Sequence, residues 1–95
     1  MKEPAIYIVT NFTRKVLYTG VTSDIIKRIY QHKHYAISGF AMKYKCNILV
    51  YYELHDCMYD AISIEKQIKA GSRVKKIKLI QNLNPEWEDL YYKLI

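Results

Sequence analysis

Residues 7–20 read YIVTNFTRKVLYTG, two apolar stretches joined by a polar segment. The stretches extend over 5–10 and 16–21 and are rich in β-branched and aromatic residues, which favour strands. Polar residues between two such stretches are typical of a hairpin loop. This part of the chain therefore predicts two antiparallel strands, with Tyr7 on the first and Tyr18 on the second.

The two tyrosines become cross-strand partners in one register of this hairpin. If the loop is symmetric about the Phe12–Thr13 bond, Tyr7 lies directly opposite Tyr18, and both side chains share one face. A bulge near Gly20 would shift the register by one residue. We therefore expect a tyrosine pair on one face, on the condition that the hairpin is regular.

A helix is predicted after the hairpin. Thr22 or Ser23 suits its cap, Asp24 suits its first turn, and the apolar spacing carries it to about Tyr35. Its predicted inner face consists of Ile25, Ile26, Ile29, Tyr30 and Lys33. Arg28 and His32 are then one turn apart and lie off this face.

A third strand and a second helix come next. The apolar stretch over 48–53 predicts a strand that is central or well covered. The helix begins near residues 56–58, with Asp56 as the candidate cap, and runs to about Lys69 before Gly71 ends it.

The last part of the chain is predicted to be helical. Ser72 caps a third helix over 73–81. Its inward residues are Val74, Ile77 and Ile80. Asn84 and Pro85 suit the start of a short final helix, which three residues can pack down, namely Trp87, Leu90 and Tyr91.

These elements define a fold class. The chain has 95 residues, so one domain over 1–95 is expected, and 51% hydrophobic residues can supply its core. The class is α+β, a three-stranded antiparallel sheet flanked by helices in the order β-β-α-β-α-α, with a short C-terminal helix.

The charge points to a polyanionic partner. Lysine and arginine exceed the acids by 15 to 9, a formal net charge of +6, which favours nucleic acid. The excess concentrates in one run without acids, made up of Lys66, Lys69, Arg73, Lys75, Lys76 and Lys78. This run predicts either a nucleic-acid-binding face or a solvated helix surface.

Other classes of protein find less support in the sequence. Cys46 and Cys57 lack the spacing of a zinc site, so we expect free thiols in a reducing, cytoplasmic setting. His32 and His34 form an HxH pair without further zinc ligands at a useful spacing. The apolar stretches stay well short of the roughly 20 residues of a membrane span, so no membrane partner is expected.

Glu65 breaks the pattern of the second predicted helix. It falls in the middle of the apolar arc formed by Met58, Ala61, Ile62, Ile64 and Ile68. A buried carboxylate needs a compensating partner. Glu65 is therefore either one half of a structural salt bridge or a metal ligand.

Together, these polar groups match the needs of phosphodiester hydrolysis. Tyr7 and Tyr18 share a hairpin face, Arg28 and His32 follow on the next helix, and Glu65 lies on the second. A cation on a carboxylate neutralises phosphate charge, an arginine holds the phosphate, and a phenol or imidazole transfers the proton of water. A single carboxylate implies one divalent cation, Mg²⁺ or Mn²⁺, with water completing its shell.

Five segments in order resemble the GIY-YIG nuclease superfamily, and specifically its small bacterial branch. The segments are AIYIVTN, LYTGVTSDIIKRIYQHK, LVYYE, AISIEKQIKAGSRVKKIKLI and NPEWEDLY. The resemblance covers nearly the whole chain, and it implies an antiparallel sheet with the active site on one face.

The resemblance also implies roles for the site residues. Tyr7 and Tyr18 would line the site, with Tyr7 activating or positioning water. Arg28 would hold the scissile phosphate, and His32 would assist proton transfer. Glu65 would carry the single Mg²⁺ or Mn²⁺. By the same resemblance, Asn84 would orient elements of the site or contact the phosphate.

Three positions depart from the family pattern. Ala5 replaces the first glycine, and Thr19 stands where isoleucine or valine is usual. Both changes leave the tyrosines in place. Val21 follows Gly20 where several branches carry lysine, which removes one candidate phosphate contact or charge that tunes the base.

The sequence therefore favours a metal-dependent endonuclease that acts on nucleic acid, DNA more than RNA. The alternative is a nucleic-acid-binding module on the same fold with little or no cleavage activity. A third interpretation is protein interaction through an apolar patch on the final helix. We expect a monomer or a weak homodimer.

Overall fold

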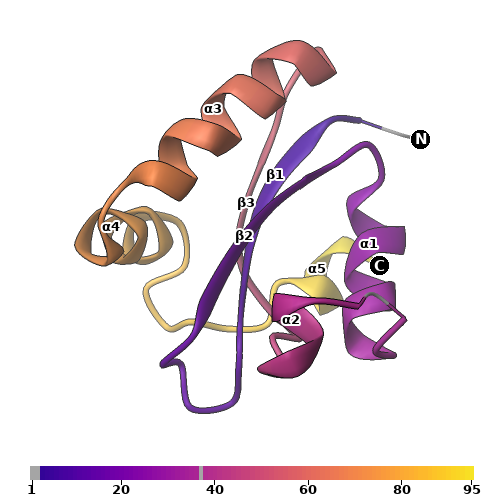
Figure 1. Cartoon of the computed structure of the whole chain (residues 1–95), viewed down its shortest axis with the longest axis vertical. Coiled ribbons are helices and arrows are strands. Elements are labelled where there is room, and N and C mark those ends of the chain that lie inside the picture. Colours follow the sequence, from indigo (N-terminus) through magenta and orange to yellow (C-terminus); the bar gives the residue numbers. More distant parts are fainter. Residues whose placement is uncertain (1–2, 37) are drawn as a thin grey trace.

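The computed structural model describes residues 3–36 and 38–95. Its elements, shown in Figure 1, are β1 (Ala5–Thr10), β2 (Leu17–Thr22), α1 (Ile25–Lys33), α2 (Phe40–Lys43), β3 (Ile48–Leu54), α3 (Met58–Ala70), α4 (Arg73–Leu83) and α5 (Tyr91–Leu94). The three strands form one antiparallel sheet in the order β2-β1-β3. The predicted α+β class and its antiparallel sheet are confirmed.

Helices cover both faces of the sheet. In Figure 1, α3 and α4 lie to one side of the strands, and α1, α2 and α5 lie to the other. All six residues of the central strand β1 are buried. This burial explains why its sequence, AIYIVT, is almost continuously apolar.

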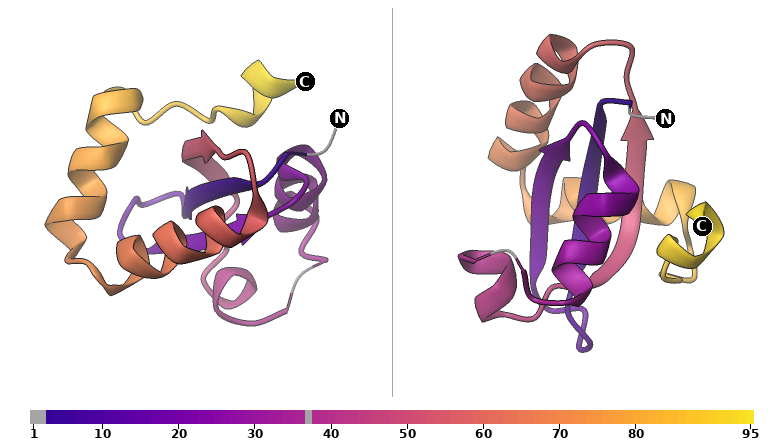
Figure 2. Two further views of the ribbon diagram at one scale, coloured as in Figure 1. Left: turned by 90° about the horizontal axis from the view of Figure 1, so that it is seen from above. Right: turned by 90° about the vertical axis from the view of Figure 1, so that its right-hand side faces the viewer.

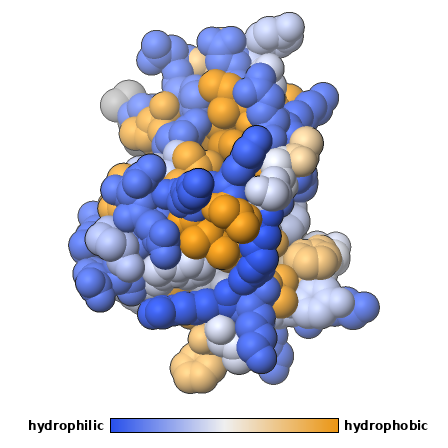
Figure 3. Space-filling model, turned by 90° about the vertical axis from the view of Figure 1, so that its left-hand side faces the viewer, coloured by the Kyte–Doolittle hydropathy of each residue, from blue (hydrophilic) through white to orange (hydrophobic). Residues whose placement is uncertain are grey.

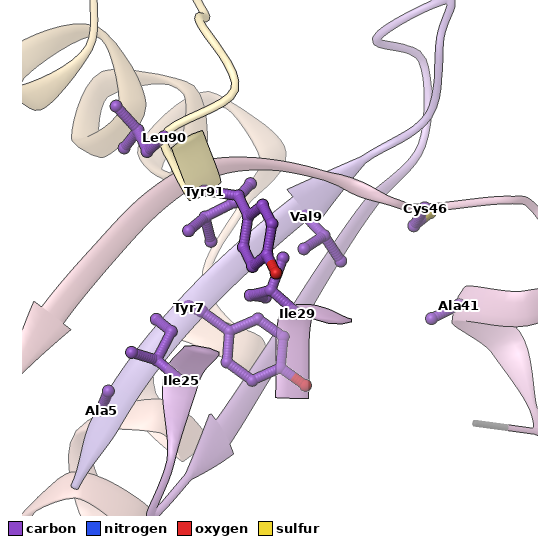
Figure 4. Close-up of a cluster of buried hydrophobic side chains, with 10 residues drawn as sticks. Ala5, Tyr7, Val9, Ile25, Ile29, Ala41, Cys46, Leu90 and Tyr91 are labelled. Carbon is purple, nitrogen blue, oxygen red and sulfur yellow. The ribbon is translucent and has the colours of Figure 1, made fainter. Parts of the chain in front are cut away.

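Successive residues of β1 enter two separate cores. Ala5, Tyr7 and Val9 belong to the larger core on the α1 side (Figure 4), together with Ile25, Ile29, Ala41, Cys46, Leu49, Leu90 and Tyr91. Ile8 points to the opposite face and packs with Val50, Tyr51 and Ile80. The period of two along a strand thus divides β1 between the α1 side and the α4 side.

The predicted hairpin register is wrong by two residues. Tyr7 pairs with Gly20, and Tyr18 pairs with Val9. The cause is Asn11, whose side-chain Oδ1 accepts hydrogen bonds from the backbone N–H groups of Lys15 and Val16, each at 3.2 Å. These hydrogen bonds close a longer loop than the predicted symmetric loop, so β2 begins at Leu17. Both tyrosines remain on one face, as diagonal neighbours with ring centroids 6.4 Å apart.

The first helix starts and ends differently from the prediction. Asp24, rather than Thr22 or Ser23, is its N-cap, and its carboxylate accepts a hydrogen bond from the N–H of Lys27 at 3.2 Å. The helix ends at Lys33 instead of Tyr35.

The inner face of α1 also differs from the prediction. Ile25 and Ile29 are buried, but Ile26 and Tyr30 are 42% and 52% exposed. His32, predicted to lie off this face, is buried instead. His32 is therefore an inner residue of α1 where the apolar pattern predicted Tyr30.

Helix α2 was not predicted, since it has only four residues. Its N-cap, Gly39, has φ 104° and ψ −155°, a conformation that is almost restricted to glycine. Helix α3 follows Cys57 as its N-cap, so the predicted cap at Asp56 is wrong. Ser72 caps α4 as predicted, and its hydroxyl accepts a hydrogen bond from the N–H of Lys75 at 3.2 Å.

The packing of α4 is confirmed only in part. Ile80 is fully buried and Ile77 is half-buried, but Val74 is 61% exposed. Leu79 packs against the second core instead. The final helix begins at Tyr91 rather than near Pro85. Leu90 and Tyr91 are buried and Trp87 packs on the second core, whereas Tyr92 and Ile95 are exposed.

The segment between α4 and α5 passes the outer edge of β3 and joins the two faces of the sheet (Figure 2). Leu90 donates its backbone N–H to the carbonyl of Leu49 at 2.8 Å. Asp89 Oδ1 accepts the N–H of Leu49 at 3.2 Å, and its other oxygen pairs with Lys33 of α1. The outer edge of β3 is therefore covered by the segment between α4 and α5.

None of the helices in the described part of the chain combines the length and the apolar character that a membrane crossing needs.

Asp89→Ala should lower the free energy of unfolding by about 2 to 3 kcal/mol. The change leaves Lys33 and the Leu49 N–H without this partner, and the Lys33 and Asp89 side chains are only 15% and 22% exposed. Urea denaturation measures the effect. The control is Glu88→Ala, which removes an exposed pair with Lys93 and should cost less than about 1 kcal/mol. Equal losses in the two variants would contradict this view of the edge.

Candidate active site

Tyr7 is the centre of the candidate site. Its side chain is 1% exposed, and Figure 4 shows its ring beside Ile25 and Ile29 of α1. The phenol oxygen forms a 3.0 Å hydrogen bond with Nε2 of His32. A polar tip on a buried aromatic ring requires such a partner. The structure therefore places a tyrosine–histidine pair between the central strand and α1.

Gly20 leaves the space that the Tyr7 ring occupies. A Cβ atom at position 20 would lie 2.4 Å from both the Cζ atom and the hydroxyl oxygen of Tyr7. Such a separation is far shorter than any van der Waals contact. Because Gly20 is the direct cross-strand partner of Tyr7, the missing side chain allows the phenol to lie across β2.

Tyr18 completes an aromatic cluster on the same face. Its ring centroid lies 6.4 Å from that of Tyr7 and 5.9 Å from that of His32. The Tyr7 and His32 rings are 5.4 Å apart and meet edge to face. Three of the predicted site residues are thus in mutual contact, although the register that brings the tyrosines together is not the predicted one.

Burial keeps both members of the hydrogen-bonded pair neutral at pH 7. It raises the pKa of Tyr7 to about 12, and the nearby Arg28 opposes this rise while Tyr18 and Glu65 add to it. Burial also lowers the pKa of His32 to about 4, and the positive charge of Arg28 lowers it further. In their neutral forms, the phenol and the imidazole can each act as donor or acceptor in this hydrogen bond, depending on the tautomer of His32.

Arg28 and Glu65 approach this pair from two different helices. The charges of both act on the Tyr7 phenol. Arg28 lines a small polar hollow at the start of α1, together with Thr22, Ser23, Asp24, Lys27 and Gln31. Glu65 is 8% exposed and lies on α3, which packs against β2 and β1. The predicted burial of Glu65 is thus observed, but Ile62, which the prediction placed in the same apolar arc, is 38% exposed.

The carboxylate of Glu65 forms an ion pair with Lys69. The ammonium nitrogen of Lys69 lies 3.6 Å from Glu65 Oε2 and 5.3 Å from the ring centroid of Tyr18. Lys69 is about half exposed, so this ion pair is weak. A divalent cation could replace it at low cost, and one carboxylate with a shell of water suits Mg²⁺ or Mn²⁺.

The donor set does not suit a metal that requires several protein ligands. Within residues 3–36 and 38–95, no group of three or more His, Cys, Asp and Glu side chains is placed to hold an ion. The residues present therefore fit a single hydrated cation on Glu65.

Asn84 lies apart from the aromatic cluster. It is the C-cap of α4 and is 4% exposed. Its amide nitrogen donates to the carbonyls of Val50 and Glu88, at 3.1 and 2.8 Å, and its amide oxygen accepts the N–H of Glu88 at 3.0 Å. The Asn84 amide is thus engaged with backbone groups of β3 and of the segment before α5, and both of its predicted roles stay predictions.

The six basic residues of the predicted nucleic-acid-binding run occupy different surroundings. Lys69 and Lys76 lie beside Tyr18, and Lys76 also lines an apolar hollow between α3 and α4 with Lys75 and Lys78. Lys66 lines a separate hollow on α3. Arg73 donates to the carbonyl of Arg14 at 2.9 Å, so it also ties α4 to the hairpin loop.

Sequence analysis missed Phe40, the first residue of α2. Its ring stacks on that of Tyr18, with centroids 6.2 Å apart and planes 24° from parallel. No helix or strand was predicted between the first helix and the strand over 48–53. A glycine directly before an aromatic residue was the available signal, because Gly39 permits the sharp entry into α2.

Comparison with known proteins agrees with this arrangement. Residues 3–78 match the GIY-YIG catalytic domain. The chain belongs to the GIY-YIG family. The match includes Tyr7, Tyr18, Arg28, His32 and Glu65, whereas Asn84 follows it.

Individual relatives extend this assignment. The GIY-YIG chain is 41% identical over 64 residues to a UPF0213 protein of Staphylococcus saprophyticus, covering 67% of this chain and 78% of the relative. It is 34% identical over 87 residues to a UPF0213 protein of Syntrophus aciditrophicus, covering 90% and 98%. The solution NMR structure of the UPF0213 protein BH0048 from Bacillus halodurans shares the fold, with a TM-score of 0.55, 23% identity and coverage of 94% and 93%.

Gly20→Ala should destabilise the GIY-YIG domain by about 1 to 3 kcal/mol, since the new methyl group overlaps the Tyr7 ring. Thermal denaturation gives the stability, and the NMR shifts of His32 report the loss of the Tyr7 hydrogen bond. Gly71→Ala is the control, because its Cβ meets its nearest atom, the carbonyl oxygen of Ile68, at 3.3 Å. A Gly20→Ala protein as stable as wild type would refute the close contact.

The stability should fall on acidification because of His32. Its folded-state pKa of about 4 lies below the ordinary 6.5, so the unfolded chain binds the proton more readily between these values. The contribution of His32 is complete above pH 6.5 and is lost as the pH falls towards 4, a change of up to about 3 kcal/mol. Urea denaturation of wild type and His32→Gln across this range isolates the effect. An unchanged difference between the two proteins at every pH would count against it.

Proposed function

We propose that this GIY-YIG protein is a metal-dependent endonuclease that hydrolyses phosphodiester bonds in nucleic acid, with DNA preferred over RNA. The observation that carries the proposal is the convergence of Arg28 and Glu65 on the hydrogen-bonded pair of Tyr7 and His32. The match to the GIY-YIG catalytic domain supports it. We further place the protein in the cytoplasm, where its free thiols Cys46 and Cys57 suit a reducing setting.

The tyrosine–histidine pair supplies the proton transfer. In the proposed reaction, water attacks phosphorus, its proton passes to the Tyr7 oxygen, and the phenol proton passes to His32. The leaving oxygen takes a proton from solvent. Burial is the main cause of the lowered pKa of His32 and the charge of Arg28 the second, and a phosphate bound next to Arg28 would offset this second cause and raise the basicity of the imidazole.

Arg28 and Glu65 deal with the charge of the phosphate. The guanidinium of Arg28 can donate two parallel hydrogen bonds to phosphate oxygens. Glu65 would hold one Mg²⁺ or Mn²⁺, which when bound stabilises the negative charge of the transition state. Lys69 is the alternative partner of Glu65 and would then be released towards the nucleic acid.

The second candidate function is a binding module with little or no cleavage. It is favoured by Val21, an uncharged residue that pairs with Ile6 in the sheet. Several branches of the family carry a positively charged lysine at this position. Lys69 weakens this argument, because its ammonium group lies over the Tyr18 ring and brings a positive charge to the same cluster from α3.

Glu65→Gln should reduce cleavage by a factor of about a hundred or more, because the neutral amide cannot hold the cation. The assay incubates plasmid, single-stranded DNA and RNA with wild type or variant, in Mg²⁺, in Mn²⁺ and in EDTA. Circular dichroism verifies the fold, and Glu53→Gln is the matched control on β3. Cleavage by the Glu65→Gln protein at the wild-type rate would refute the role of Glu65. Binding without cleavage by wild type in every metal would establish the binding module.

A further inference from the structure

We propose that the hollow beside Tyr18 binds the nucleotide next to the scissile phosphate, with its base stacked on Phe40. The hollow lies between β2, α2, α3 and α4 and is lined by Leu17, Tyr18, Thr19, Phe40, Lys69 and Lys76. This inference rests on the proposed function and adds to it a site that selects the conformation of the substrate.

Phe40 has the properties of a stacking platform. Its side chain is 50% exposed although it is a large aromatic group. Tyr18 and Tyr44 both contact its ring, with centroids at 6.2 and 4.7 Å, while half of the side chain stays open to solvent. Stacking on a ring that is already fixed costs little conformational entropy. Every base offers an aromatic face, so such a platform accepts nucleotides without strong sequence preference.

Two ammonium groups make the same hollow attractive to phosphate. Lys76 on α4 donates a hydrogen bond to the backbone carbonyl of Lys69 on α3, at 3.3 Å. The nitrogen of Lys69 lies over the Tyr18 ring at 5.3 Å. Lysines from two helices thus line one hollow, where a bound phosphate would lie near both positive charges.

The combination of charge and aromatic surface identifies the occupant. Phosphate alone needs only the lysines, and an apolar partner needs only the rings. A nucleotide uses both. Tyr18 belongs to the hollow and also contacts Tyr7 and His32, so a base on Phe40 leaves its own phosphate close to the reacting groups.

The basic surface continues from the hollow towards α4. Lys76 also lines the neighbouring hollow, whose surface is apolar and whose lining includes Ile68, Leu79, Lys75 and Lys78. Figure 3 shows this side of the molecule, where apolar surface is surrounded by hydrophilic side chains. The strand would run from Tyr18 past Lys76 along α4.

This placement constrains the substrate. A base that stacks on Phe40 cannot be paired and stacked within a duplex at the same time. The nucleotide at the cleavage point is therefore expected to be unpaired or turned out of the helix.

The test measures binding in EDTA, so that cleavage plays no part. Fluorescence anisotropy compares a labelled oligothymidylate with the same sugar–phosphate chain lacking bases. Phe40→Ala should weaken binding to the oligothymidylate about tenfold and leave binding to the abasic chain unchanged. Phe40→Trp should keep the affinity. Lys76→Gln should weaken binding to both chains and lower the salt dependence by about one unit of slope.

Phe12→Ala is the matched control, since Phe12 is 91% exposed and lies in the hairpin loop. If Phe40→Ala matches Phe12→Ala on both chains, or weakens binding to both equally, the base site is refuted. Failure of the proposed function is distinguishable, because it shows as absence of cleavage by wild type with Mg²⁺ and Mn²⁺ whatever the variants bind.

Discussion

The close approach of the Tyr7 ring to the backbone of Gly20 is the constraint on which the rest of the site depends. The phenol can reach across β2 only because position 20 carries no Cβ atom. From there its hydroxyl meets His32 of α1, and it comes under the charges of Arg28 and Glu65. The absence of a side chain at position 20 of the edge strand thus allows the buried Tyr7 hydroxyl to reach His32 of α1.

The hydrogen bond of the Tyr7 phenol also explains why a histidine is tolerated in the core. A buried imidazole without a partner would destabilise the fold. Because Tyr7 satisfies Nε2 and burial keeps the ring neutral, His32 fills an inner position of α1. On the opposite edge of the sheet, Asp89 fixes the end of β3 to α1 through Lys33. Helix α1 is therefore attached to the central strand through His32 and to β3 through Lys33 and Asp89, and these two attachments position Arg28 and His32.

The strands, the order of the long elements and the burial of Glu65 could be predicted because period and composition determine them locally. The hairpin register could not, because it depends on hydrogen bonds from the Asn11 side chain to Lys15 and Val16 that no apolar pattern reveals. The burial of His32 could not either, since it depends on a partner 25 positions away. Helix α2 is too short to show a period, and it brings Phe40 to Tyr18 by tertiary packing. These features are determined by side-chain hydrogen bonds and tertiary contacts, which the spacing of apolar and polar residues does not reveal.

The pairing of Glu65 with Lys69 shows how one chain can both hold a buried carboxylate and keep it available. A fully buried ion pair would resist exchange, because separating it leaves a charge without a partner. Here the lysine is about half exposed and 3.6 Å away, so its ammonium can return to water at little cost. Glu65 therefore remains compensated in the free protein, and in the proposed reaction it would accept a cation when nucleic acid binds. The lysine so released lies above Tyr18, where a phosphate would replace the carboxylate as its counter-ion. The same side chain would thus neutralise the acid before binding and the substrate after it.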